Sequence, residues 1–136
     1  MEDYWVILEA ALAERHASRP VHSAAEMRHL SDRFPNAIEL HTAEADGEVL
    51  AGVLLFIAGP VVHAQYIATG PEGRQVGALD GLFVHLLAAP WPEARVFDFG
   101  TSNTQNGRVL NEGLIRQKEE FGASVVVHDV YEVDIS

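Results

Sequence analysis

The residues best suited to acid–base chemistry lie on one apolar segment in the middle of the chain. His63, Gln65 and Ile67 alternate along it, so an extended strand would place them on one face, opposite Ala64 and Tyr66. Histidine changes charge closest to neutral pH and can take a proton from an ammonium group, while the Gln65 amide can orient that group or a water. The pattern favours a general base at His63, or else a structurally satisfied histidine at a strand end. Tyr66 is interpreted as a core residue.

A glycine-rich segment follows directly and has the composition of a phosphate-binding turn. Gly70, Gly73 and Gly77 allow consecutive backbone N–H groups to converge, and the start of the next helix adds positive potential. Arg74 could add a charge-assisted contact to the same anion. The competing interpretation is a plain strand-to-helix loop with flexible glycines and a surface arginine.

Polar residues near the end of the chain supply further candidates. Glu112 stands near the start of a predicted helix, where it could face the preceding loop and act as a base or anchor an amine. Lys118 and Glu119 lie a turn or more further on, where structural salt bridges are the expected role. Asp98 is expected to hold the loop Thr101 to Asn106 in place through hydrogen bonds.

Metal chemistry and covalent catalysis find little support in the sequence. The seven histidines form no i, i+4 pair and no cluster with acidic residues at a known ligand spacing, so no metal site is expected. No serine stands in a nucleophile-elbow motif and the chain has no cysteine, so direct transfer between bound substrates fits better. His22, in the turn between the first two predicted helices, is expected to border a pocket for one of these substrates.

Length and charge narrow the remaining classes. A chain of 136 residues fits one domain, and its 48% hydrophobic and 21% charged residues are ordinary for a folded protein. The net charge of −11 opposes binding to nucleic acid or to an anionic membrane surface. The longest apolar run, Val49 to Val62, is too short to cross a bilayer, and the acidic start lacks the features of a secretory signal. A cytoplasmic protein is therefore expected.

Hydrophobic periodicity predicts an α/β domain of the α+β type. A capping box at Ser23 and Glu26 starts the second helix, Asp46 with Gly47 supplies a tight hairpin turn, and Gly122 is expected to end the last helix. The strands that flank a crossover helix should run parallel, and the others antiparallel. The predicted helices are Asp3 to His16, Ser23 to the residue before Pro35, Gly77 to Leu87 and Arg108 to Phe121, and the strands are Ile38 to Thr42, Val49 to Ile57, Val61 to Ala68, Val96 to Phe99 and Val125 to Val133.

This order of elements resembles the GNAT N-acyltransferase superfamily, with YIATGPEGRQVGALDGL after one strand and NEGLIRQKEEFGA before the last. The segments FDFG, at Phe97 to Gly100, and GLIRQKEEFGA, at Gly113 to Ala123, look closest to the GNAT-like half of FemAB-type proteins. The resemblance covers most of the chain and implies a GNAT-like mixed, mostly antiparallel sheet flanked by four helices. Residues 1–136 are then one GNAT-like domain that lacks the first and last strands of a full GNAT fold.

The resemblance also implies a reaction and a set of site residues. The donor would be acetyl-CoA, and its acetyl group would pass to an amine of a small or sugar-linked acceptor. The family places a catalytic base on the strand of His63, so the predicted catalytic set is His63, Gln65 and Glu112. The donor pyrophosphate would bind at the entrance to the third helix, where the predicted residues are Ala68, Thr69, Gly73, Arg74, Gln75, Gly77 and Ala78. Leu79 departs from the Gly or Ala that usually ends this pattern.

Two alternatives stay open. FemAB proper uses aminoacyl-tRNA, so the chain could transfer an aminoacyl group instead of an acetyl group. It could also be a catalytically silent GNAT-like module that pairs with itself or with a neighbouring domain, which the imperfect phosphate pattern favours. Uncovered strand edges invite pairing, so a homodimer or association with a preceding domain is the expected assembly, with no nucleic acid or membrane partner.

Overall fold

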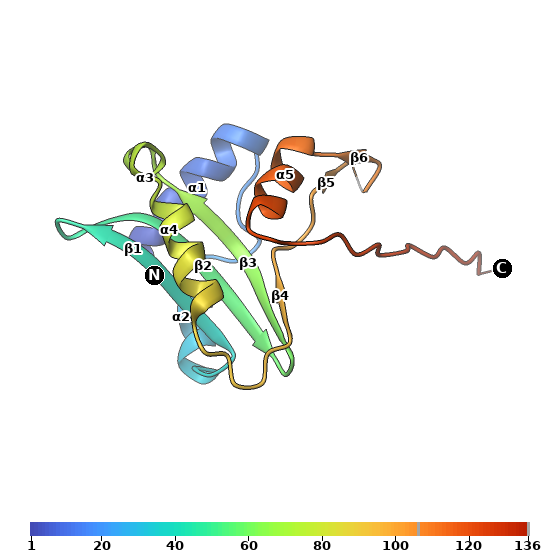
Figure 1. The fold of residues 1–136 in the computed structure, drawn as a ribbon, viewed down its shortest axis with the longest axis horizontal. Coiled ribbons are helices and arrows are strands. Elements are labelled where there is room, and N and C mark those ends of the chain that lie inside the picture. The colour runs from blue at the N-terminus through green and yellow to red at the C-terminus, as the bar shows by residue number, and fades with distance from the viewer. Residues whose placement is uncertain (106, 136) are drawn as a thin grey trace. The chain divides into compact units, whose positions relative to one another are not determined.

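The computed structural model describes residues 1–105 and 107–135, and their contacts divide into two compact units, Met1–Gly100 and Thr101–Ser136. No helix in this described part of the chain has the length and apolar character of a membrane span. The elements of the first unit are α1 (Glu2–His16), α2 (Ala24–Arg33), β1 (Ile38–Ala45), β2 (Glu48–Ala58), β3 (Val61–Thr69), α3 (Pro71–Val76), α4 (Ala78–Ala88) and β4 (Val96–Asp98) (Figure 1). The second unit contains β5 (Asn103–Thr104), β6 (Val109–Leu110) and α5 (Glu112–Glu120).

The first unit is built on a four-stranded sheet in the order β1-β2-β3-β4. β1 and β2 pair antiparallel through a turn at Asp46 and Gly47, whose φ angles of 51° and 82° fit the predicted tight hairpin. β2 and β3 also pair antiparallel, whereas β3 and β4 run parallel because α3 and α4 carry the chain back between them. The predicted mixed, mostly antiparallel sheet flanked by helices is confirmed.

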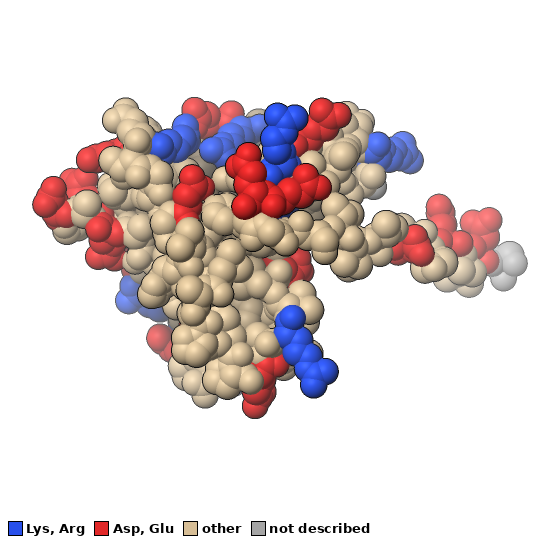
Figure 2. All heavy atoms as spheres, in the orientation of Figure 1, with Lys and Arg blue, Asp and Glu red and all other residues tan. Residues whose placement is uncertain are grey.

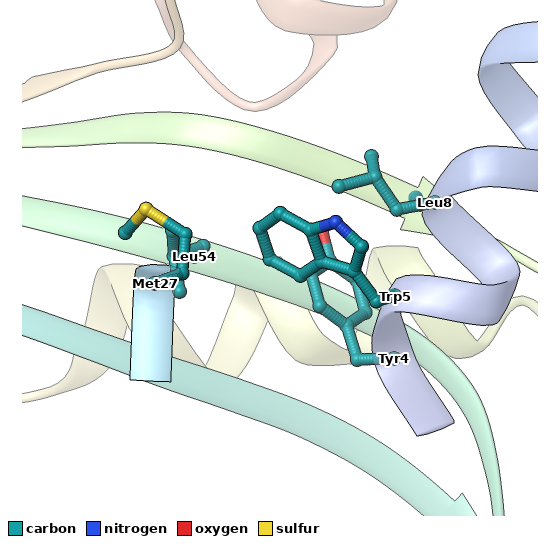
Figure 3. Close-up of a cluster of buried hydrophobic side chains, with 6 residues drawn as sticks. Tyr4, Trp5, Leu8, Met27 and Leu54 are labelled. Atoms are coloured by element: carbon teal, nitrogen blue, oxygen red, sulfur yellow. The ribbon is translucent and has the colours of Figure 1, made fainter. Parts of the chain in front are cut away.

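Helices cover both faces of this sheet. α4 lies over the face turned toward the viewer in Figure 1, and α1 and α2 lie behind the strands. The core on the α1–α2 side is a cluster of Tyr4, Trp5, Leu8, Met27, Leu54 and Ala68 (Figure 3). A Cβ on Gly52 of β2 would stand 2.4 Å from the Tyr4 ring, so only glycine fits there. Burial raises the pKa of Tyr4 well above its usual value, so its phenol stays neutral.

The predicted capping box starts α2. Ser23 Oγ accepts the Glu26 N–H at 3.2 Å, and the Glu26 carboxylate accepts the Ser23 N–H at 2.7 Å. The hydrogen bond from the Ser23 backbone, helped by the Ser23 hydroxyl, lowers the pKa of Glu26 below its usual value. This local signal was readable from the sequence because the four residues involved are contiguous.

The segment after β3 differs from its prediction. The glycine-rich segment ahead of the helix predicted from Gly77 is expected to be a turn or loop, but Pro71–Val76 form the short helix α3 there, which adds a fifth helix to the four predicted. Proline at the first helical position is favourable, because its fixed φ suits a helix and its missing N–H would have no helical partner there. Gly77, at φ +67°, separates α3 from α4.

The second unit also differs from its prediction. The helix predicted from Arg108 begins at Glu112, because β5 and β6 form a small hairpin ahead of it. The predicted loop Thr101 to Asn106 therefore contains β5, and Asn106 itself lies outside the described residues. Gly122 follows the helix at φ +88°, as its predicted terminating role requires.

The predicted final strand, Val125 to Val133, is wrong. Residues 123–135 have neither helix nor strand, although the valines there have a strong strand preference. A strand needs a neighbour to pair with its backbone N–H and C=O groups, and none of the described strands pairs with this segment. Its valines are exposed, with Val126 at 73% and Val130 at 92%. A strong strand preference therefore does not produce a strand when no neighbouring strand is available to pair with it.

Candidate active site

A β-bulge interrupts β3 at Gln65. Leu54 of β2 lies opposite Tyr66, and the next residue of β2, Leu55, lies opposite Ala64, so Gln65 is the extra residue in the register. An extra residue reverses the alternation of side chains beyond it. The strict alternation predicted across this segment is therefore wrong.

The bulge brings His63 and Tyr66 to the same face of the sheet. His63 lies opposite Phe56 and Tyr66 opposite Leu54, and both partners on β2 belong to the core against α1 and α2. Residues directly opposite on neighbouring strands share a face, so His63 and Tyr66 do too. Ile67, predicted beside His63, turns to the other face.

His63 is paired with a carboxylate on the neighbouring strand. Its Nδ1 lies 2.7 Å from Asp98 Oδ2, and Asp98 Oδ1 accepts the Gly100 N–H at 2.8 Å. The side chains of His63 and Asp98 are 33% and 45% exposed, so a ligand can reach them. An imidazole that is held by a carboxylate and open to solvent can accept and release a proton.

Sequence reasoning missed this pair, although the predicted topology contained it. Asp98 is predicted to hold the loop Thr101 to Asn106, and its carboxylate accepts the N–H of Gly100, the residue before that loop. The contact between Asp98 and His63 was not foreseen. β3 and β4 begin in register, with Val61 opposite Val96, so their third residues are His63 and Asp98. Counting from the starts of two parallel strands would have found the pair.

A second imidazole contact lies on the same face. His22, in the turn between α1 and α2, has its Nδ1 2.9 Å from the Tyr66 hydroxyl. The Tyr66 ring also meets the Trp5 ring edge to face, with centroids 5.5 Å apart. Tyr66 therefore packs as a core residue, as predicted, and its polar end meets His22.

Three of the residues predicted to bind the donor have packing tasks at the end of β3. A Cβ on Gly73 would stand 2.3 Å from the Leu50 carbonyl oxygen, so glycine is required for α3 to lie against β2. The Thr69 hydroxyl donates to the same carbonyl at 3.3 Å. Ala68 is buried in the core cluster. Contacts within the protein therefore explain why these three residue types occur here, and no bound ligand is needed for that explanation.

The other four predicted donor residues lie at the junction of α3 and α4. Arg74 forms an ion pair with Glu14 of α1 at 3.0 Å, and Gln75 is exposed. A Cβ on Gly77 would meet no atom within 4 Å, and Ala78 is the first residue of α4. No side chain in the described chain caps the N-terminus of α4. This helix end is open, with the positive end of its dipole outward.

Glu112, the third predicted catalytic residue, belongs to the second unit. It is the first residue of α5, and Asn111 caps this helix by accepting the Leu114 N–H at 3.0 Å. Lys118, in the same unit, is 8% exposed and donates from Nζ to the Thr101 carbonyl at 2.8 Å, in keeping with a structural role. A role for Glu112 beside His63 stays a prediction, because the two residues belong to different units.

A hollow of about 270 Å³ lies on the other face of the first unit. Val62 and Phe97 form part of its wall, and they stand one position away from His63 and Asp98 along their strands, so they face α4 instead. The hollow is therefore separate from the His63 site. Among residues 1–105 and 107–135, no group of three or more His, Asp or Glu side chains could hold a metal ion.

Several solved structures share this fold. A possible acetyltransferase from Clostridium difficile 630 has a TM-score of 0.71 at 12% identity, covering 99% of this chain and 91% of that one. An aminoglycoside acetyltransferase from an uncultured soil metagenomic sample has a TM-score of 0.65 at 18% identity, covering 100% and 90%. A ribosomal-protein-alanine N-acetyltransferase from Brucella melitensis biovar Abortus 2308 has a TM-score of 0.63 at 18% identity, covering 99% and 92%. At these identities the likeness shows the fold alone.

The family of the chain is shown by its sequence, whereas these structures show the fold alone. It matches no curated protein at a significant level. A family model described as an acetyltransferase (GNAT) domain nevertheless matches residues 1–106, which include the whole sheet and the His63–Asp98 pair. The mixed, mostly antiparallel sheet agrees with this match, and the chain belongs to the GNAT acetyltransferase family.

Proposed function

We propose that this protein transfers the acetyl group of acetyl-CoA to the amino group of a small molecule. The observation that carries the proposal is the match of residues 1–106 to the acetyltransferase (GNAT) family, whose members use acetyl-CoA. The open N-terminus of α4 and the exposed imidazole of His63 supply the two chemical functions that such a transfer needs, an anion-binding end and a proton acceptor.

The donor diphosphate would bind at the N-terminus of α4. The open space at Gly77 and the lack of a capping side chain in the described chain support this assignment, since an anion can approach the helix amides. Arg74 would have to exchange Glu14 for phosphate, which is a small cost because the exposed Arg74–Glu14 pair contributes little. Asp80, in the first turn of α4, opposes an anion by its charge. Backbone N–H groups would therefore carry most of the contact.

The acceptor we propose is a cationic amine. The net charge of −11 favours the approach of a cation, and carboxylates are spread over the face drawn in Figure 2. One structural neighbour is described as an aminoglycoside acetyltransferase, which supports a small-molecule amine. His22 and Tyr66 lie on the same face of the sheet as His63 and would border the acceptor.

In the proposed reaction His63 takes a proton from the ammonium form of the acceptor. The neutral amine nitrogen then bonds to the thioester carbonyl carbon, and the C–S bond breaks. The nitrogen loses a second proton as the amide forms, and that proton ends on the departing thiolate. Gln65 would orient the amine or a water, and Glu112 would serve as a further base or amine anchor. Alignment of the amine with the thioester supplies much of the rate gain.

The test combines binding with turnover. Calorimetry should detect acetyl-CoA at micromolar protein, and thiol release should saturate with at least one member of a panel of aminoglycosides, amino sugars and polyamines. The chain has no cysteine, so a thiol reagent would report the released coenzyme A alone. Absence of binding heat with both acetyl-CoA and coenzyme A would contradict the proposal.

A catalytically silent module is the second candidate. The packing of Gly73 and the Arg74–Glu14 pair favour it, because both residues have contacts that need no donor. A third candidate is FemAB-like transfer of an aminoacyl group from aminoacyl-tRNA in place of an acetyl group. The net charge of −11 opposes the binding of tRNA. A gel shift with charged tRNA separates aminoacyl from acetyl transfer.

We also propose that the protein forms a homodimer, or associates with a preceding domain, in the cytoplasm. The exposed valines of residues 125–133 and the open edge of the three-residue strand β4 support association, because exposed apolar side chains and open strand edges tend to find partners. Light scattering that gave the mass of a single chain, 14.9 kDa, would contradict the homodimer.

A further inference from the structure

Asp98 meets two different groups with its two carboxylate oxygens. Oδ1 accepts the Gly100 N–H at 2.8 Å, and Oδ2 lies 2.7 Å from His63 Nδ1. Gly100 has φ +76°, a conformation that glycine adopts readily, and a Cβ there would stand 3.8 Å from His63 Cε1. The turn after β4 therefore anchors Asp98 and borders the imidazole.

This arrangement decides which nitrogen of His63 carries the proton. An ionised carboxylate only accepts hydrogen bonds, so Nδ1, the nitrogen beside Asp98, must be the donor. In the neutral imidazole the other nitrogen, Nε2, then has a free lone pair. The described residues form no hydrogen bond to Nε2, and the side chain is 33% exposed. The basic nitrogen is thus the one that a ligand can reach.

We propose that Asp98 is a positioning residue that holds His63 in the Nδ1–H tautomer and leaves Nε2 as the proton acceptor. This inference rests on the proposed acetyl transfer and adds the residue that prepares its base. In the step, an N–H bond of the acceptor ammonium breaks and its proton bonds to Nε2, giving a neutral amine and an imidazolium. Asp98 stays ionised and stabilises that positive charge.

The variant Asp98→Asn separates this role from packing, because the two side chains have nearly the same shape. A carboxamide has one acceptor oxygen and an NH₂ group that only donates. The Gly100 N–H can only donate, so it takes the oxygen and leaves the NH₂ group facing His63 Nδ1. Nδ1 must then accept, the proton moves to Nε2, and the base is lost.

The decisive measurement is a long-range ¹H–¹⁵N correlation spectrum of the histidine rings of the whole chain, recorded at about pH 8 so that the neutral tautomers are observed. We expect the Nδ1–H tautomer for His63 in the wild type and the Nε2–H tautomer in Asp98→Asn, with the signals assigned from His63→Gln. An Nε2–H tautomer in the wild type would overturn the proposal without any variant. An unchanged tautomer in folded Asp98→Asn would overturn it as well.

The chain contains a matched control for this experiment. His41 Nε2 lies 2.8 Å from Glu39 Oε2, so the same reasoning predicts the opposite tautomer, Nε2–H, for His41 in the same spectrum. Glu39→Gln should leave both the tautomer of His63 and the rate of acetyl transfer unchanged. A loss of activity in Glu39→Gln equal to that in Asp98→Asn would overturn a specific role for Asp98.

Turnover provides an independent readout. Asp98→Asn should lower kcat/KM roughly 100- to 10,000-fold, with the Kd for acetyl-CoA unchanged, because only the proton transfer is affected. A wild-type rate in this variant would overturn the proposal. If the wild type releases no thiol with any acceptor, the acetyl-transfer proposal fails, while the tautomer spectrum still decides whether Asp98 sets the protonation of His63.

Discussion

Two histidine–carboxylate pairs in the first unit have similar nitrogen-to-oxygen distances and similar exposure to solvent. The nitrogen-to-oxygen distance is 2.7 Å for His63 and Asp98 and 2.8 Å for His41 and Glu39. The two histidine side chains are 33% and 30% exposed. Distance and exposure alone therefore do not separate a proton-transfer pair from a surface contact.

The pairs differ in how each carboxylate is held. Asp98 is on a different strand from His63, 35 residues away in sequence, and its second oxygen accepts a backbone N–H. Glu39 and His41 are two positions apart on β1, and in the described chain no backbone N–H donates to the Glu39 carboxylate. The His41 ring instead packs edge to face on Trp91, with centroids 6.0 Å apart. A backbone anchor fixes orientation, which an exposed pair of flexible side chains does not achieve.

The largest expected difference between the two pairs is in turnover. His63→Gln should lower kcat/KM roughly 100- to 10,000-fold, because the amide cannot accept and release a proton. His41→Gln, which removes the other imidazole, should leave turnover close to that of the wild type. Thiol-release kinetics of the two variants side by side measure this, and equal losses would contradict the assignment of His63 as the base.

The next test concerns Gly100, whose backbone N–H holds Asp98 and whose positive φ favours glycine. Gly100→Ala should destabilise the fold by about 1 to 2 kcal/mol, because φ +76° is strained for a residue with a Cβ. It should also lower turnover, since the N–H that holds Asp98 would shift. Gly47→Ala is the control, because Gly47 has φ +82° in the β1–β2 hairpin and lies outside the proposed site. Urea unfolding should show similar losses for both, with activity reduced only in Gly100→Ala.

The Glu26 carboxylate also accepts a backbone N–H, that of Ser23, but it lies outside the proposed site and so extends the comparison. Ser23→Ala should lower the free energy of unfolding by about 1 kcal/mol, because it removes the side-chain cap of α2, and turnover should not change.

The pH dependence of stability tests the Glu26 carboxylate itself. The pKa of Glu26 is lowered by its hydrogen bonds with Ser23, so the charged carboxylate stabilises the folded protein at pH values above the usual pKa of 4.5. This stabilisation disappears as the pH falls through the folded-state pKa. Thermal unfolding from pH 7 to pH 3 should show the wild type losing its advantage over Glu26→Gln.

The smallest effect is expected at the unanchored pair. Glu39→Gln should change the free energy of unfolding by roughly 0.5 kcal/mol or less, because exposed ion pairs contribute little. Chemical denaturation of the variant and the wild type at low and high salt measures the difference. A loss above about 1 kcal/mol would show that the His41–Glu39 pair is more than a surface contact.

The sequence by itself determined the features that depend on neighbouring residues. The capping box at Ser23 and Glu26, the turn at Asp46 and Gly47, and the end of α5 at Gly122 were all predicted, because backbone preference and hydrogen bonds within a few residues decide them. The parallel pairing of β3 and β4 followed from the helix between them. His63 was singled out by residue type.

Only the tertiary structure decided which side chains meet across the sheet. The bulge at Gln65 turned Tyr66 to the face of His63, and the strand register brought Asp98 to the imidazole. Gly73 proved to be needed where α3 lies on β2, and the valines of residues 125–133 formed no strand. These outcomes depend on the distances between atoms far apart in the chain. Residue preferences carry no information about such distances, because they describe each residue with its immediate neighbours only.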